Sequence, residues 1–116
     1  MSKKIIITDY GMGNLHSVKN AFEYIGAQCA LSSCPDDLES ADAVILPGVG
    51  AFPDASDTLF DSGYAQKLTK LAKDGMPILG ICLGMQLLLE ESDEVRPSRG
   101  LGLIKGRCEK IRDTGL

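Results

Sequence analysis

Residues 78–84 read Ile-Leu-Gly-Ile-Cys-Leu-Gly, an apolar strand that runs into a cysteine with glycines on both sides. The form Gly-x-nucleophile-x-Gly is typical of a sharp strand-to-helix turn, where crowding leaves room only for glycine at the flanking positions. The leucine-rich segment 83–91 predicts the helix that this turn requires. We therefore predict that Cys82 is a nucleophile whose thiolate the helix N-terminus favours, and that the Leu83 N–H faces a developing oxyanion. The alternative is a small, buried and inert cysteine.

Short apolar strands alternate with amphipathic helices along the rest of the chain. Strands are predicted at residues 5–8, 28–31, 43–46 and 78–81, and helices at 15–25, from Pro35, after Pro53, at 64–74 and at 83–91. This alternation predicts an α/β fold with a mostly parallel sheet and right-handed crossovers. Further along, residues 92–100 predict a polar loop, while 101–104 and 107–111 predict two more strands.

Composition limits the classes of function. The chain has 116 residues, a net charge of -4, and 44% hydrophobic but only 5% aromatic residues. This length predicts one domain, 1–116, and the mild acidity argues against nucleic-acid binding and polybasic membrane attachment. We see no signal peptide or spanning segment, so we expect a cytoplasmic protein. No metal site is expected, because no CxxC or CxxH spacing relates the four cysteines, which are Cys29, Cys34, Cys82 and Cys108.

Two glycine-rich loops follow predicted strands. Loops at strand C-termini converge on the ligand site of a doubly wound sheet, so segment 47–50 is expected to lie beside the cysteine. Its glycines would let an N–H of Val49 or Gly50 complete an oxyanion hole. A simple strand terminator is the alternative. Segment 11–14 lacks the third glycine of a dinucleotide loop and the lysine of a P-loop, which favours a tight turn or a contact with a partner.

Four motifs in order resemble a known family. Segment 80–86 is similar to the nucleophile segment of class I, triad-type glutamine amidotransferases. Segments 9–14, 47–52 and 100–104 narrow the resemblance to the glutaminase subunit of imidazole glycerol phosphate synthase, of histidine biosynthesis. The resemblance runs over about residues 4–106 and implies a flavodoxin-like, three-layer α/β/α fold.

The resemblance also implies a reaction. Glutamine is hydrolysed to glutamate and ammonia through a cysteinyl thioester, without a cofactor. The ammonia passes to a (β/α)8-barrel cyclase subunit, which makes imidazole glycerol phosphate. By motif, the resemblance assigns the nucleophile to Cys82, the oxyanion hole to Leu83, Val49 and Gly50, glutamine binding to Gly50, Gln86 and Glu94, and the cyclase-facing loop to Gly11, Met12 and Asn14.

The chain departs from the family pattern in one respect. The family's base is a histidine, held by a glutamate in an FHPE-type segment, and this chain has no such segment. Its only histidine, His16, lies in the first predicted helix, and we expect it to be solvated or at an interface. We therefore expect an N-terminal part of the family domain that is catalytically incomplete alone. The alternatives are a non-catalytic module that binds the cyclase subunit or self-associates, and a thiol hydrolase or redox protein of the same superfamily.

Overall fold

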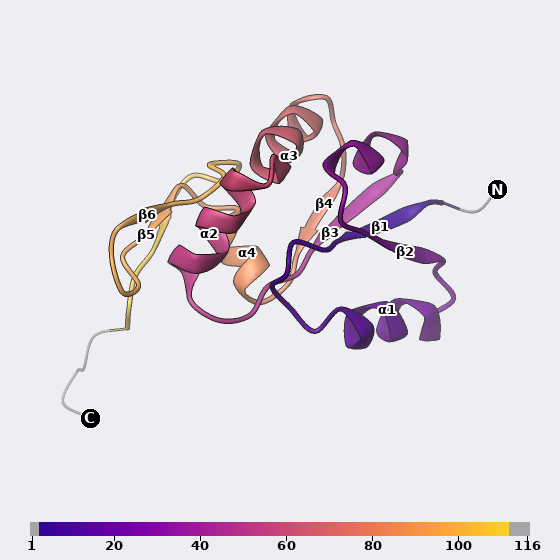
Figure 1. The fold of residues 1–116 in the computed structure, drawn as a ribbon, viewed down its shortest axis with the longest axis horizontal. Helices are drawn as coiled ribbons and strands as arrows, with labels where there is room; N and C mark the ends of the chain where they lie inside the picture. Colours follow the sequence, from indigo (N-terminus) through magenta and orange to yellow (C-terminus); the bar gives the residue numbers. More distant parts are fainter. Residues whose placement is uncertain (1–2, 112–116) are drawn as a thin grey trace.

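The computed structural model describes residues 3–111, and its central feature is a parallel sheet with helices on both faces (Figure 1). The elements of this sheet and its helices are β1 (Ile5–Thr8), α1 (Leu15–Tyr24), β2 (Cys29–Ser32), the 3-10 helix η1 (Pro35–Ser40), β3 (Ala43–Leu46), α2 (Phe52–Asp61), α3 (Tyr64–Lys73), β4 (Ile78–Gly80) and α4 (Leu83–Leu87). The predicted α/β class and the four predicted strands are confirmed, with ends that differ by at most one residue.

The four strands lie in the order β2-β1-β3-β4, and every pair is parallel. In the register, Ile7 of β1 lies beside Ile45 of β3, which lies beside Leu79 of β4. Helix α1 lies on one side of the sheet, and α2 and α3 lie on the other (Figure 1). The loops after β3 and β4 therefore leave the same edge of the sheet.

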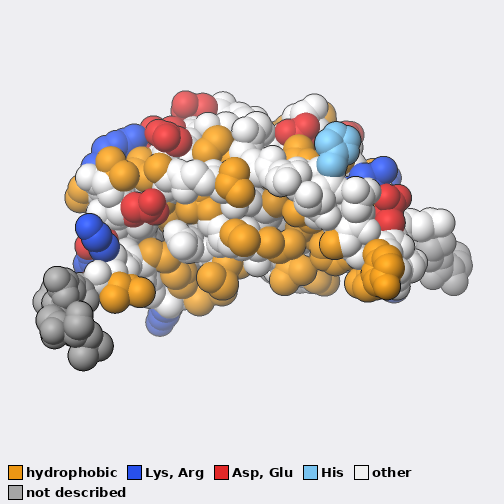
Figure 2. All heavy atoms as spheres, turned by 90° about the horizontal axis from the view of Figure 1, so that it is seen from below, with side chains coloured by type: hydrophobic (Ala, Val, Ile, Leu, Met, Phe, Trp, Pro, Cys, Tyr) orange, Lys and Arg blue, Asp and Glu red, His pale blue; other side chains and the backbone are white. Residues whose placement is uncertain are grey.

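The main core lies between the sheet and the α2–α3 layer. Alternate residues of the strands, such as Ile6 and Val44, enter this core, where they meet buried side chains of the two helices, including Phe52 and Leu59. The α1 face is more open, since α1 buries no residue completely and Leu79 of the edge strand is 52% exposed. Figure 2, which views the molecule from this side, shows hydrophobic side chains among polar ones on the surface.

Three predictions near the C-terminus are wrong, and tertiary hydrogen bonds explain why. The helix predicted over 83–91 ends at Leu87. Residues 101–104 form no strand, because their N–H groups donate to the carbonyls of residues 87–89 and thereby cap the end of α4. The predicted loop 92–100 contains strand residues at both of its ends.

The strand residues at the ends of segment 92–100 belong to a small second sheet. Strands β5 (Glu91–Ser92), β6 (Ser98–Arg99) and β7 (Arg107–Cys108) pair in the order β6-β5-β7, so the strand predicted over 107–111 is only two residues long. Strands β5 and β6 pair antiparallel and form a hairpin. Strand β6 contacts α2, and the hairpin stands at the end of the molecule away from the N-terminus (Figure 1). Within residues 3–111, each helix is too short or too polar to span a bilayer.

Candidate active site

The turn between β4 and α4 has the strained geometry that its sequence predicts. Cys82 has φ 56° and ψ −121°, a conformation that a non-glycine residue rarely adopts. A Cβ on Gly80 would lie 2.7 Å from the Cα of Met85. A Cβ on Gly84 would overlap the carbonyl oxygen of Leu46. Both glycines are therefore required by close backbone approach, and the Cys82 side chain is left exposed.

The loop after β3 packs directly against this turn. A Cβ on Gly48 would lie 3.0 Å from the Gly84 nitrogen, so this glycine is also needed for close approach. The buried Tyr10 hydroxyl donates to the Pro47 carbonyl at 2.6 Å and holds the loop from the other side. Burial raises the pKa of the Tyr10 hydroxyl, so it keeps the proton that this bond needs.

The expected oxyanion donors differ in their present hydrogen bonding. The Leu83 N–H donates to the Gly48 carbonyl oxygen at 3.2 Å, so a substrate oxyanion would have to replace this bond. Among the described residues, neither the Val49 nor the Gly50 N–H has an acceptor. Gly50 has φ 95°, a left-handed conformation that suits glycine and that aims its peptide group without steric cost.

A hollow of about 370 Å³ brings the predicted site residues together. Its walls come from the loop after β3, from the Cys82 turn and α4, and from the loop between β5 and β6. It is lined by Gly48, Val49, Gly50, Cys82, Leu83, Met85, Gln86 and Glu94. Every residue that the sequence assigns to the nucleophile, the oxyanion hole or glutamine binding is in this set, although their roles stay predictions.

The loop before α1 lies next to this hollow. A Cβ on Gly13 would lie 3.5 Å from the Pro47 side chain, and the Met12 methyl group stands 3.6 Å from a Cβ placed on Gly50. Gly11 and Asn14 are exposed, which is compatible with the predicted contact with a partner. Asn14 also has a structural role that its motif did not indicate, because its side chain caps α1 by accepting the Ser17 N–H.

Other polar groups do not extend this site. His16 is exposed on α1 and does not line the hollow. Burial raises the pKa of the Cys29 thiol, with a further contribution from Glu23, and burial raises that of Cys108, with a contribution from Glu94. Neither shift activates a thiol. Among residues 3–111, no three histidine, cysteine or acidic side chains converge as metal ligands.

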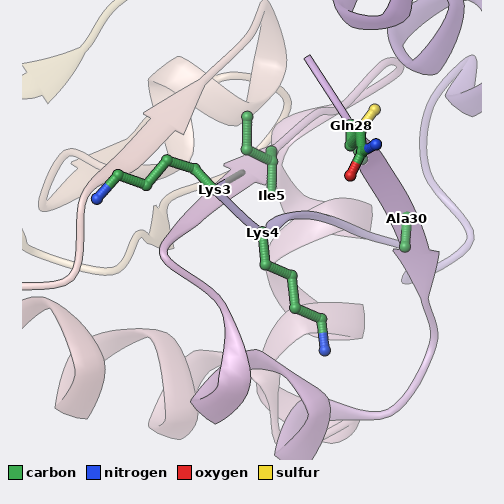
Figure 3. A pocket seen from close by; sticks show the side chains of 6 residues that line it. Lys3, Lys4, Ile5, Gln28 and Ala30 are labelled. Carbon is green, nitrogen blue, oxygen red and sulfur yellow. The ribbon is translucent and has the colours of Figure 1, made fainter. Parts of the chain in front are cut away.

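A second hollow, at the opposite edge of the sheet, shows no such convergence. It is lined by residues 3–5 and 28–30, at the amino ends of β1 and β2 (Figure 3). The Lys3 and Lys4 side chains point away from each other (Figure 3). The Lys4 Nζ donates to Ser40 at 2.9 Å. The two lysine ammonium groups are therefore not placed to bind one ligand together.

Sequence reasoning missed three residues that hold the site in place. Tyr10 positions the loop after β3, and its place directly after a strand in a glycine-rich motif was an available signal. Ser56 and Ser92 are 3% and 2% exposed. The Ser56 hydroxyl donates to the hairpin that carries Glu94, and the Ser92 hydroxyl accepts the Glu94 N–H within that hairpin. Isolated serines carry no comparable signal in a single sequence.

Comparison with known proteins adds the family. The sequence model of the family described as glutamine amidotransferase class-I matches residues 6–107. The imidazole glycerol phosphate synthase subunit HisH of Bacillus licheniformis is 53% identical over 107 residues, which are 92% of this chain and 50% of that protein. The same subunit of Symbiobacterium thermophilum is 49% identical over 110 residues, or 95% and 52%.

A solved structure agrees in fold. The crystal structure of a glutamine amidotransferase superposes with a TM-score of 0.77 at 20% identity, and the match covers 90% of this chain and 55% of that one. The chain spans about half the length of the curated relatives it matches. The family match covers most of the chain and includes the Cys82 turn, both glycine-rich loops and Glu94. The chain therefore belongs to the class I glutamine amidotransferase family.

Proposed function

We propose that this chain carries the nucleophile and glutamine-binding part of a glutaminase that supplies ammonia for imidazole glycerol phosphate synthesis. The observation that carries the proposal is the hollow in which Cys82, with its strained backbone, stands beside Gln86 and Glu94. Identity of about 50% to the synthase subunit HisH of two bacteria supports the same pathway.

The chemistry follows from the groups in the hollow. The Cys82 sulfur attacks the side-chain amide carbon of glutamine, and the negative charge moves to the amide oxygen. The Val49 and Gly50 N–H groups stabilise that oxygen, as does Leu83 once its bond to Gly48 is exchanged. The C–N bond then breaks, nitrogen leaves as ammonia with the proton of the thiol, and a thioester remains. Water adds to the thioester and releases glutamate and the free thiol.

Two further polar side chains line the hollow and are available to the substrate's other end. Gln86 lies on α4, one turn after Cys82, and Glu94 lies on the hairpin loop. A carboxylate in this hollow favours the positively charged α-amino group of glutamine. We assign the proton transfers to the histidine–glutamate pair that the family resemblance implies, because the residues lining the hollow include no histidine.

The proposed acceptor of ammonia is a (β/α)8-barrel cyclase subunit, in a cytoplasmic heterodimer. The exposed Gly11 and Asn14 lie on the loop beside the hollow, where a partner could cover both. We expect a complex between this chain and the cyclase subunit of the Bacillus licheniformis synthase in size-exclusion chromatography. Separate elution of the two proteins at micromolar concentrations would contradict this part of the proposal.

Covalent labelling tests the glutaminase proposal directly. The reagent is an analogue of glutamine in which a chloromethyl ketone replaces the side-chain amide, so that a thiolate displaces chloride and forms a C–S bond. We expect one adduct per chain by intact mass, located at Cys82 by peptide mapping. Excess glutamine should slow the labelling, because it occupies the same hollow.

An internal control is present in the chain. Cys34 is also exposed but stands outside the hollow, so it reports the reactivity of an ordinary surface thiol. Labelling of Cys34 as fast as Cys82, without protection by glutamine, would overturn the proposal and favour a non-catalytic interaction module. The variant C82S should lose the adduct and leave the slow reaction of Cys34 unchanged.

A further inference from the structure

The hairpin loop that carries Glu94 is held in a strained conformation. Val95 has φ 64°, and it shares positive φ only with Cys82 among the described non-glycine residues. The Arg96 N–H donates to the Glu94 carbonyl at 2.7 Å across Val95, which is the pattern of the rare, strained γ-turn. A β-branched residue in this conformation persists only where its surroundings hold it. Cys82 lines the hollow of the candidate site, and Val95 lines a neighbouring hollow that shares Gln86 and Glu94 with it.

Part of that hold is local. Ser92 is 2% exposed, and its hydroxyl accepts the Glu94 N–H at 3.1 Å. Together with the γ-turn, this bond directs the backbone of Glu94 from both sides. It does not determine where the loop stands relative to Cys82, because all of these bonds lie within the hairpin.

Helix α2 supplies the external hold. The Ser56 hydroxyl, 3% exposed, donates to the Arg99 carbonyl at 2.6 Å, at the end of the hairpin. The Arg96 guanidinium donates to Asp57 at 2.8 Å. The Arg99 guanidinium stacks on the Phe60 ring at 3.8 Å from its centroid. These three contacts come from two consecutive turns of α2.

The same helix also contacts the nucleophile turn. Helix α2 packs against α4, which begins immediately after Cys82. One helix therefore touches both the element that presents the nucleophile and the loop that presents Glu94. The Arg96–Asp57 pair is half exposed and weak, whereas the buried Ser56 hydroxyl is the strong contact.

We propose that Ser56 is a positioning residue, through which α2 places the Glu94 carboxylate at the distance from Cys82 that the α-amino group of glutamine requires. This inference rests on the proposed function and adds a specificity device to it. Without the Ser56 hydroxyl, the Arg99 carbonyl loses its partner and the strained turn loses its external support. Recognition of the amino group then weakens, while the chemistry at Cys82 is unchanged.

The test compares two reagents on the whole chain. The first is the chloroketone analogue of glutamine, and the second is the same chloroketone without the α-amino group. The half-saturating concentration and the maximal rate of Cys82 labelling are measured for each. In the wild-type chain we expect the amino-bearing reagent to saturate at a clearly lower concentration.

We expect S56A to raise the half-saturating concentration of the amino-bearing reagent about fivefold, as loss of one buried hydrogen bond implies. Its maximal rate, and both constants for the reagent without the amino group, should stay the same. D57N should act in the same direction by about twofold, as a half-exposed ion pair implies, and it provides a second variant should S56A not fold.

The matched control is T58A, on the same helix. The Thr58 hydroxyl donates to the Asp54 backbone carbonyl within α2, so its removal should leave the labelling constants of both reagents unchanged. Equal effects of S56A on both reagents, or no effect of S56A and D57N, would overturn the positioning role while leaving the glutaminase proposal intact. A wild-type chain that labels Cys82 without preferring the amino-bearing reagent overturns the inference and the role of Glu94 together.

Discussion

Replacement of Gly84 tests whether backbone contact, rather than helix preference, governs the nucleophile turn. A Cβ at this position would overlap the Leu46 carbonyl oxygen and stand 2.7 Å from its carbon, against an ordinary carbon–carbon contact of about 3.5 Å or more. Strand β3 cannot retreat easily, because it is paired on both sides and its Leu46 carbonyl accepts the Ile81 N–H at 2.9 Å. Although alanine favours the helix by about 1 kcal/mol, we expect Gly84→Ala to lower the free energy of unfolding by about 3 kcal/mol.

Gly75→Ala is the matched comparison. Gly75 has φ 96° and open space where a Cβ would stand, so its replacement costs only the left-handed strain, about 1–2 kcal/mol. Backbone preference alone predicts the opposite order, because Gly84 lies inside a helix. Urea unfolding followed by circular dichroism measures both variants. A Gly84→Ala protein as stable as the wild type, or more stable than Gly75→Ala, would refute the steric reasoning.

Three further perturbations follow from the structure. Glu94→Gln should raise the half-saturating concentration of the amino-bearing chloroketone for labelling of Cys82 about tenfold, because a charge-assisted hydrogen bond is lost. An unchanged half-saturating concentration would argue against contact between Glu94 and the amino group. Burial raises the pKa of Tyr64 to about 12, so the folded state holds its proton more tightly than the unfolded state does. The contribution of Tyr64 to stability should therefore be constant below about pH 10 and be lost between about pH 10 and pH 12. In urea unfolding, the midpoint of Tyr64→Phe should lack this part of the fall with pH. Leu59→Ala should lower the free energy of unfolding by about 3 kcal/mol and Leu79→Ala by less than half of that, since their side chains are 0% and 52% exposed. Equal losses in urea unfolding would contradict the open α1 face of the sheet.

The sequence predicted the parallel sheet and the gathering of the site because both depend on local patterns. Runs such as residues 5–8 and 43–46 are apolar and β-branched, and each ends at a glycine-rich or polar break. Loops at the carboxyl ends of parallel strands meet at one edge by topology alone. The glycines around Cys82 also predicted the strained turn, since a side chain at Gly84 would not fit beside the Leu46 backbone.

The remaining features depend on contacts between distant segments. Nothing local ends α4 at Leu87, because the carbonyls after it are satisfied by residues 101–104. The Leu83 N–H donates to the Gly48 carbonyl, and this bond forms only when the loop after β3 lies against the Cys82 turn. The motif around Cys82 does not contain that loop, so it predicted a Leu83 N–H that faces the substrate. The left-handed Val95 has no sequence signal, since its hairpin is packed against α2, which is distant in the sequence.

The fit of Gly84 against the Leu46 carbonyl also couples reactivity to folding. The Cys82 turn is strained, and the surfaces that hold it strained are backbone atoms of β3 and of the loop after it. A molecule in which β3 has come away from β4 loses the contacts that hold this turn strained. Under the proposed function, immature or partly denatured molecules should then not react with glutamine. The folded sheet and the proposed reactivity toward glutamine thus depend on the same packed glycine.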